Sequence, residues 1–534
     1  MRFPVLFFSF YFLLLFGSRA SQIQVSGSVS GVWDVDTVLV VNNLSINNAE
    51  TLQINSGVLV LFDGHYTVQV LGQIVALGIA NDPIIFTVSD TLGFSNLQSN
   101  DGAWNGLWFN HVASLNDSSL FEYCNFYNGK AVGADSTYWY GGAASIRECN
   151  KIRFSNCRFE NNRAYKNGGA VYARDANIKI DNCVFENNLC GLSDLYGYGG
   201  ALCLEYADAI VFRSYFTQNS STGVGGGLSF EYSNPRIESN EFYNNYSAIG
   251  GGLVSLRSDG DVSIVNNLVI ENSALFFGGG IAVLESTTLF VNNTIAENFS
   301  SSGGGLYLNS DASPIFKNCI FWNNWDYSGE GPQVYIWDIY SAPEFSYCNI
   351  EDGVDAFGGS GGSGSFVGIY ENCLEENPQF VGAGVQAFDL DENSMCINAG
   401  TPDTSSLYLP AVDIAGNTRI VGSGVDIGAY EFQNSAGFND HFQNTNDLSV
   451  YPNPFSESIN INYKVENNEQ VSISLYDALG RLVAVIAEND KVSGDKTIHW
   501  ETIPEINQNQ NSEYYLKLET LNYKITKKLI YHNY

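Results

Sequence analysis

The sequence is poor in charged residues and in helix formers. Only 15% of its 534 residues are charged and only 2 are Met, whereas Gly (53), Phe (34) and Tyr (31) are abundant, as is Asn. This composition is unusual for an enzyme. It argues against long helices and favours strands, tight turns and stacked side chains. A chain of this length also has enough apolar core to fold without disulfide bonds.

Basic residues are few. The chain has 24 Lys and Arg against 57 Asp and Glu, which gives a net charge of −33. This balance argues against recognition of nucleic acid or of an anionic membrane through charge. Residues 447–534 hold 12 acids and 8 bases, so most of the negative charge lies upstream. The excess indicates a well-hydrated surface, with cation binding as the alternative.

Residues that bind metals or catalyse reactions are also scarce. The five His residues have no catalytic partner nearby in the sequence, and no Cys pair or Cys/His cluster has the spacing of a zinc site. Three groups of acids fit solvated turns better than paired catalytic carboxylates. They are Asp259-Gly260-Asp261, Glu351-Asp352 and Asp389-Leu390-Asp391-Glu392. No motif supports calcium either. We therefore assign no catalytic, cofactor-binding or metal-binding residue.

Long apolar runs are absent after the N-terminus. Arg2, the apolar run 5–16 and Ser18-Arg19-Ala20 together have the pattern of a secretory signal peptide, 1–20, cleaved after Ala20. The run is too short to span a membrane, and no later stretch approaches the required length. We expect no transmembrane segment in the mature chain.

The main feature of the sequence is a repeat of about 27 residues. Its first landmark is an Asn that recurs with a mean step of 27 residues. The seven positions are Asn162, Asn188, Asn219, Asn245, Asn272, Asn298 and Asn324. Apolar residues stand three and eight positions before each of them, and a small or polar residue stands five positions before. An insertion near residues 191–198 lengthens one step.

The second landmark is Gly-Gly, about twenty residues before each Asn. It begins at Gly141, Gly168, Gly199, Gly226, Gly251, Gly279 and Gly304. Alternating segments follow it, which indicates strands with one buried face. Such a unit cannot close a core alone, whereas stacked copies can. The sequence therefore predicts an all-β protein whose body is a right-handed parallel β-helix, or solenoid.

Equivalent positions of successive coils would stack about 4.8 Å apart. We expect the Asn column to form a structural ladder of amides that bond to one another and to turn backbone, without a ligand role. Five Cys residues stack in the inward column and are expected to be free thiols: Cys124, Cys157, Cys183, Cys319 and Cys348. Cys373 and Cys396 are expected to lie off this ladder, where they form a possible disulfide.

Two motifs of the repeat resemble those of a known family. They are Gly-Gly-Ala-[Val/Leu] at 168–171 and 199–202, and Phe-x-x-Asn beginning at Phe159, Phe185, Phe216, Phe242 and Phe321. They are similar to the repeats of chlamydial polymorphic membrane proteins and related bacterial β-helix adhesins. Later copies depart by carrying Gly-Gly-Gly, and two lack the Phe. The resemblance implies a surface protein.

Less regular segments flank the repeat. Residues 21–120 are predicted to form an N-terminal cap and first irregular coils, 121–352 the regular repeats, and 353–433 the last coils and a cap. Gly358 to Ser365 is expected to be a flexible Gly/Ser loop. Residues 434–446 are polar, lack periodicity and are expected to form a linker.

A separate module follows the linker. Residues 448–455 (Leu-Ser-Val-Tyr-Pro-Asn-Pro-Phe), 471–483, 514–518 and 525–530 resemble the type A sorting domain of the type IX secretion system of Bacteroidetes. The resemblance covers 447–534, and its alternating strands predict a small C-terminal β-sandwich. It implies export by the type IX machinery across the outer membrane of a Bacteroidetes-like bacterium, followed by release or attachment at the cell surface.

The sequence leaves three functions open. The favoured one is a noncatalytic, adhesin-like or glycan-interacting surface protein, because stacking explains the residues that repeat most strictly. Tyr138-Trp139-Tyr140, Trp322 and Trp325 would stack on sugars or on neighbouring loops. The alternative is a polysaccharide lyase or glycoside hydrolase with a carboxylate and basic cluster assembled across coils. The third is a structural component of the surface layer.

Overall fold

The computed structural model describes residues 22–433 and 448–531, apart from positions 97, 134, 192–195, 383–385, 406, 453–454, 456–457, 478–481, 502–512 and 520–523. The expected signal peptide with its cleavage site at Ala20, and the expected linker 434–446, lie outside the described residues.

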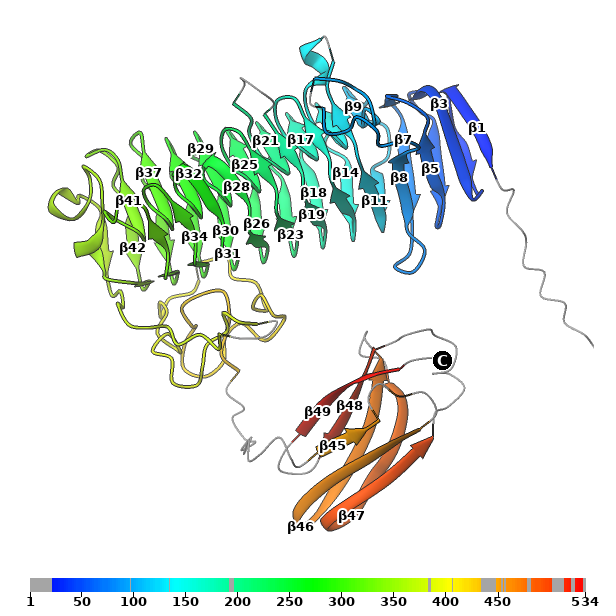
Figure 1. The fold of residues 1–534 in the computed structure, drawn as a ribbon. Helices are drawn as coiled ribbons and strands as arrows, with labels where there is room; N and C mark the ends of the chain where they lie inside the picture. The colour runs from blue at the N-terminus through cyan, green and yellow to red at the C-terminus, as the bar shows by residue number, and fades with distance from the viewer. Residues whose placement is uncertain are drawn as a thin grey trace, which may run out of the picture. The chain divides into compact units, whose positions relative to one another are not determined.

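The chain divides into two compact units, residues 1–433 and 434–534. The first contains a parallel β-helix (Figure 1). Equivalent strands of successive coils pair in parallel into four stacks, which we call sheets A to D. In a regular coil the chain passes through sheets C, A, D and B in turn.

The strands of the four sheets have the following bounds. Sheet A contains β1 (Ile23–Ser28), β3 (Thr37–Ile46), β5 (Leu59–Phe62), β8 (Ile84–Val88), β11 (Cys124–Tyr127), β15 (Arg158–Glu160), β19 (Val184–Glu186), β23 (Tyr215–Thr217), β27 (Glu241–Tyr243), β31 (Leu268–Ile270), β35 (Thr294–Ala296), β39 (Ile320–Trp322) and β43 (Asn349–Ile350). Sheet B continues from the second half of β3 through β6 (Val68–Val70), β9 (Leu107–Asn110), β13 (Ala144–Arg147), β17 (Val171–Arg174), β21 (Leu202–Glu205), β25 (Leu228–Glu231), β29 (Leu253–Leu256), β33 (Ile281–Leu284), β37 (Leu306–Asn309) and β41 (Val334–Ile336). Sheet C contains β2 (Gly31–Trp33), β4 (Thr51–Asn55), β7 (Gln73–Leu77), β10 (Ser119–Glu122), β14 (Ile152–Ser155), β18 (Ile178–Asp181), β22 (Ile210–Phe212), β26 (Arg236–Glu238), β30 (Ser263–Val265), β34 (Leu289–Val291), β38 (Ile315–Lys317), β42 (Glu344–Ser346) and β44 (Ile369–Glu371). Sheet D contains the short strands β12 (Lys130–Ala131), β16 (Arg163–Ala164), β20 (Leu189–Cys190), β24 (Ser220–Ser221), β28 (Tyr246–Ile249), β32 (Ser273–Phe277), β36 (Phe299–Ser300) and β40 (Trp325–Asp326). Short 3-10 turns lie at η1 (Ser136–Tyr138), η2 (Val354–Ala356) and η3 (Ser363–Ser365).

Columns of like apolar side chains fill the interior of the solenoid. Phe159, Phe185 and Phe216 are fully buried, and the ring centroids of successive members lie 4.7 Å apart. Phe126 and Phe242 extend the column at 4.8 Å on either side. Because the step of the repeat equals one coil, each Phe packs on its own equivalent, as offset aromatic rings prefer.

The Asn column runs beside these rings. Each amide from Asn162 to Asn298 donates from Nδ2 to Oδ1 of the next ladder Asn, at 2.9–3.1 Å. The residue with positive φ is the one before each ladder Asn, such as Asn187 and Asn244. The left-handed turn and the amide ladder therefore use different positions.

The Gly-Gly column differs from its prediction in the later coils. Positive φ occurs at Gly141, Gly168 and Gly199, the first Gly of each pair, but in the later coils at Gly225, Gly250, Gly278 and Gly303, one residue before the assigned pair. The predicted register is therefore wrong by one residue from Gly226 onward. A Cβ on the second Gly of each group would clash with the next coil, and at Gly226 it would stand 2.4 Å from the carbonyl oxygen of Gly251.

All ten cysteines are free. Cys373 follows β44, whose pairing with β42 places it in register with Cys348, so the prediction that Cys373 lies off the ladder is wrong. Its Sγ donates to the Glu371 carbonyl, whereas Sγ of Cys396 accepts a bond from Asn349. The expected disulfide between Cys373 and Cys396 is therefore not formed.

The predicted flexible loop 358–365 is instead packed against β41. The Gly358 N–H donates to the Val334 carbonyl, and the Gly358 carbonyl accepts from the Ile336 N–H. A Cβ at Gly358 would stand 1.3 Å from the carbonyl oxygen of Glu330. Glycine is required here for close approach of two backbones, not for flexibility.

After β44 the chain leaves the coil path. Residues 372–433, which we call the C-terminal flank, fold back along sheet A, as Figure 1 shows in yellow beside the green coils. The outward side chains of Leu268, Ile270 and Ile320 are buried against the flank. In the coil of β15 the same two positions hold the charged residues Arg158 and Glu160, which are partly exposed.

The second unit is a five-stranded antiparallel sheet. Its strands are β45 (Leu448–Tyr451), β46 (Ser458–Asp477), β47 (Leu482–Glu501), β48 (Glu513–Glu519) and β49 (Lys524–Ile530). Both halves of the long strand β46 contribute to one core, through Ile459 and Leu475, as in a β-sandwich. Within the described ranges, no helix has the length and apolar character needed to cross a membrane.

Candidate functional site

Aromatic side chains, most of them exposed, lie along sheet D and in the turn after β41. We call Phe276, Phe299, Trp325, Tyr327 and Trp337 the aromatic patch. The exposed fraction is 57% for Trp325 and 86% for Tyr327. Register explains the grouping, since β32, β36 and β40 are adjacent and Phe299 pairs with Trp325, with ring centroids 4.0 Å apart. Exposed groups of this kind mark binding surfaces.

A half-buried ring anchors this patch. Phe277 stacks on Tyr307 at 4.5 Å and meets the edge of Trp337 at 5.4 Å. Tyr307 is 3% exposed, so the rings beneath the patch are fixed by packing. Phe276 and Trp337 thus lie beside packed rings, whereas Trp325 packs on Phe299.

The aromatic candidates from the sequence divide into three groups. Tyr138 stacks on Trp108 at 4.5 Å, and Trp139 packs on Tyr165 at 4.8 Å, so both contribute to local packing. Trp322 packs against the cluster formed with the C-terminal flank. Trp325 lies in the aromatic patch.

Sequence reasoning missed the other members of the patch. They fall outside the strictly repeated columns, and Tyr327 and Trp337 have no aromatic equivalent in most coils. The available signal was the spacing of Phe299 and Trp325, which is one coil.

The three acidic groups stay apart. Asp259 and Asp261 are exposed in the turn between β29 and β30. Glu351 is half-buried and accepts bonds from the Asn323 N–H and from Gln333, and burial raises its pKa. Asp389 lies in the flank, where burial raises its pKa as well. Among the described residues no hydrogen bond or ion pair joins one group to another, so they form no paired catalytic site.

Charges on the sheet faces neutralise one another. Arg257 bridges Glu231 at 2.7 Å and Glu285 at 3.1 Å, across three successive coils. Arg158 pairs with Glu160 at 2.7 Å and also with Glu186. Exposed pairs of this kind contribute little to stability.

The most enzyme-like cluster lies on sheet B. The Tyr172 hydroxyl donates to Glu205 at 2.7 Å, and Arg174 lies 3.8 Å from the same carboxylate. Tyr172 is 1% exposed, and burial, followed by the negative charge of Glu205, raises its pKa. A buried phenol with a raised pKa is a poor general base.

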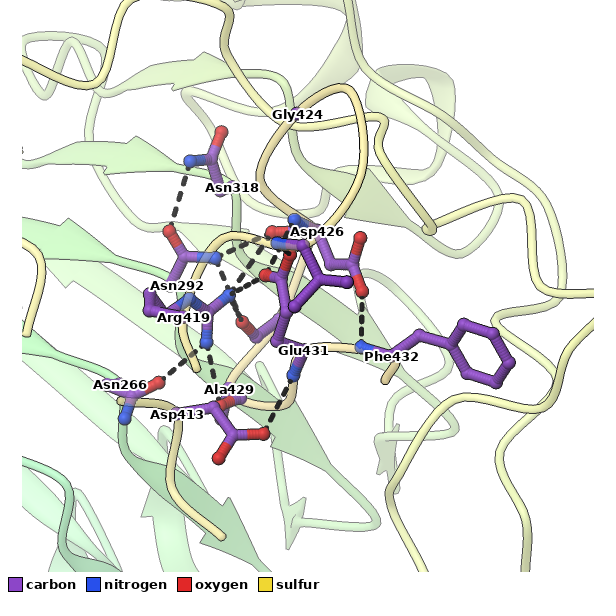
Figure 2. Close-up of polar contacts among 12 residues, drawn as sticks. Asn266, Asn292, Asn318, Asp413, Arg419, Gly424, Asp426, Ala429, Glu431 and Phe432 are labelled. Atoms are coloured by element: carbon purple, nitrogen blue, oxygen red, sulfur yellow. Dashed lines mark hydrogen bonds and ion pairs between the residues drawn. The ribbon is translucent and has the colours of Figure 1, made fainter. Parts of the chain in front are cut away.

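A buried charged cluster attaches the C-terminal flank to the solenoid (Figure 2). The Arg419 guanidinium is 2% exposed, lies 3.4 Å from Glu431 and donates to the Asn266 side chain and to the Ala429 carbonyl. Burial raises the pKa of Glu431 to about 7, and the nearby Asp426 adds to the shift. Burial likewise lowers the pKa of Arg419. The cluster is closed to solvent, so its role is to hold the flank.

Among the described residues, histidines and metal ligands supply no further site. His65 bonds to the Lys130 carbonyl, and His111 pairs with Glu148. His499 bonds to Asn460 on the sorting unit, while His441 and His532 lie outside the described residues. Over the described part of the chain, no group of three or more His, Cys, Asp or Glu residues is arranged to hold a metal ion.

Comparison with known proteins matches both units. The model of the right handed beta helix region matches residues 105–299 and 278–398, together more than half of the chain. The model of the secretion system C-terminal sorting domain matches residues 449–532. No curated protein matches the chain. A solved structure, the enzymatically active domain of tailspike protein 4 of bacteriophage CBA120, is similar at 11% identity and a TM-score of 0.24. The match covers 92% of this chain but only 62% of that one.

Proposed function

We propose that this chain, which belongs to the right-handed β-helix family, is an exported, noncatalytic surface protein that binds glycan chains on its solenoid. The observation that carries this proposal is the aromatic patch. Four of its five rings are exposed, and flat aromatic faces suit the apolar faces of sugar rings.

Export follows from the second unit. The sorting domain matched at residues 449–532 directs secretion, in a Bacteroidetes-type bacterium, to the medium or the cell surface. We infer that it engages the type IX machinery, as the motifs at 448–455 and 471–483 indicate. The likeness to polymorphic membrane proteins remains a resemblance of motifs that supports a surface location.

Binding by the aromatic patch is tested with a glycan array probed with the full secreted chain. The double variant Trp325→Ala and Trp337→Ala removes two exposed rings, and we expect binding to fall about tenfold or more. Tyr408→Ala is the matched control, because Tyr408 is an exposed aromatic on the C-terminal flank and is expected to leave binding unchanged. Absence of binding to any glycan, or equal binding by the double variant, contradicts the proposal.

The alternative is a polysaccharide lyase or hydrolase, for which the Tyr172, Arg174 and Glu205 cluster is the best candidate. We expect no cleavage of pectin, alginate or glycosaminoglycans, measured by reducing ends and by absorbance of unsaturated products. Cleavage that is lost in Glu205→Gln would overturn the noncatalytic assignment. Asp259→Asn, at an exposed turn, is the control for this variant.

A further inference from the structure

The N-terminal end of the solenoid presents an open sheet edge (Figure 1). β1 pairs with β3 on one side, through Ile23 with Val38 in sheet A and through Ser28 with Ser45 in sheet B. Among the described residues, no strand pairs with the other side of β1. β2 is likewise the first strand of sheet C and pairs with β4 alone. The first coil therefore offers unpaired backbone N–H and C=O groups, which are a template for another strand.

Apolar side chains are also incompletely covered at this end. Val32 is 59% exposed. Four other aliphatic side chains of the first coil pack against the core but are only partly buried: Ile23, Val25, Val29 and Val35. Val38 and Val40, which pair with Ile23 and Val25 in the next coil, are fully buried. A further layer of strands on this end would remove the remaining apolar surface from water, which is stabilising.

This edge lacks the features that block strand addition in other proteins, such as Lys, Pro or inward-pointing charge. Residues 22–33 contain no charged residue and no Pro. The one irregularity, between Val25 and Gly27, lies where β1 passes from sheet A to sheet B, and Gly27 has positive φ there. The segment Ile23–Val25 is therefore a regular, uncharged edge.

The opposite end of the solenoid is covered or charged. β41, the last strand of sheet B, exchanges backbone hydrogen bonds with Gly358. In sheet A, Asn349 of β43 pairs with Leu374 of the C-terminal flank. Phe357 covers the last coil, is 4% exposed and packs against Phe345 at 5.3 Å. β44, the last strand of sheet C, carries an exposed Glu371. The solenoid thus has one protected end and one open end.

We propose that the open end is a self-association surface, at which two copies of this chain pair head to head through β1. Antiparallel pairing centred on Gln24 places Ile23 opposite Val25 of the second copy, both on the core side. Gln24 then faces Gln24 of the second copy on the outer side. A strand edge is complementary to its own copy in this arrangement, and a two-fold axis gives a closed dimer. The dimer requires the predicted cleavage after Ala20, but it is independent of glycan binding.

Charge favours the first coil as the place where two copies meet. The chain has a net charge of −33, so two copies repel each other over most of their surface. The uncharged stretch 22–33 reduces this repulsion at the contact. The nearest acids, Asp34 and Asp36, lie between β2 and β3 and still oppose it. Salt screens such repulsion, so the dimer should become more stable as the salt concentration rises.

Analytical ultracentrifugation of the secreted chain, residues 21–534, measures this association. We expect a monomer–dimer equilibrium between about 1 and 100 μM, which shifts toward dimer from about 0.05 to 0.5 M NaCl. Gln24→Glu keeps the shape of an exposed side chain but places like charges opposite each other, and we expect Kd to rise about fivefold. Gln69→Glu is the matched control, because Gln69 is exposed on β6, which is paired on both sides. It should change Kd less than twofold.

A second control tests the other end of the solenoid. Ile369 is 50% exposed on the edge strand β44, and Ile369→Glu should change Kd less than twofold. A chain that stays monomeric throughout overturns the proposal, as does a dimer that Gln24→Glu leaves unchanged. A dimer that Ile369→Glu or Gln69→Glu weakens as much as Gln24→Glu contradicts the head-to-head contact. A dimer that dissociates as salt is added contradicts it as well.

Discussion

At the scale of residues, each ladder Asn satisfies several buried groups at once. Nδ2 of Asn272 donates to the carbonyls of Phe242 and Ile270 and to Oδ1 of Asn298. Its own Oδ1 accepts from the backbone and side chain of Asn245. A buried amide with this many partners fixes the register between coils, because a shift would leave all of them unsatisfied.

Asn272→Ala is therefore expected to lower the free energy of unfolding by about 3–5 kcal/mol. This loss of stability has two causes. The hydrogen bonds of the Asn272 side chain are missing, and the buried carbonyl and amide groups that they satisfied remain without partners. Urea unfolding measures it. Asn100→Ala, at an exposed loop position, is the control and should change stability by less than about 0.5 kcal/mol. A similar small effect at Asn272 would contradict the ladder.

The thiols differ in exposure. Nine of the ten cysteines are buried, whereas Cys373 at the last coil is only half-buried. A hydrogen bond from the Cys348 side chain, the largest contribution, lowers the pKa of Cys373. We expect iodoacetamide to modify Cys373 first in the folded protein and the other nine only after unfolding. Mass spectrometry of the alkylated protein measures this order, and Cys373→Ser should abolish the early product. A disulfide between Cys373 and Cys396 would instead protect both.

At the scale of elements, the C-terminal flank is attached by a cluster with more acids than bases. Arg419 faces Glu431, Asp413 and Asp426, so one positive charge stands among three buried carboxyl groups. Breaking such a cluster by removing the cation leaves unpaired buried charge. The flank in turn covers the apolar outer side chains of sheet A.

This cluster predicts a pH dependence of stability. The pKa of Glu431 is raised from 4.5 to about 7 in the folded protein, so the folded state binds this proton more tightly than the unfolded state. The stabilising contribution is complete below pH 4.5 and is lost as the pH rises through 7. Glu431→Gln should therefore reduce the loss of stability between pH 5 and pH 7, by about 3 kcal/mol at most.

Urea unfolding at pH 5 and pH 7 measures this difference. Glu392→Gln, at an exposed position of the same flank, is the control and should keep the wild-type dependence. If wild type and Glu431→Gln show the same change with pH, Glu431 is not the titrating group.

At the scale of the whole molecule, the two units have different proposed functions. In the proposed function the solenoid binds glycans, and the second unit, which matches the model of a secretion sorting domain, directs export. Deleting residues 447–534 should leave the protein inside the outer membrane of the native host, and joining these residues to a periplasmic reporter should move the reporter out. Fractionation and immunoblotting measure both. An equal distribution of full-length and truncated chains would contradict the sorting role.

The sequence alone determined the architecture. A strict step of about 27 residues places each Phe and Asn above its equivalent, and only parallel stacking satisfies all of those columns together. The sorting unit was also evident, because its motifs are local in the chain. The inward cysteines could be placed because they occupy one column of the repeat.

Only the tertiary structure decided the rest. The path of the C-terminal flank depends on contacts between residues more than a hundred positions apart, such as Arg419 with Asn266, and no periodicity marks such contacts. The aromatic patch likewise contains side chains from different coils and turns. Their positions follow from the register of the coils and from the turns between them, which local sequence patterns do not specify.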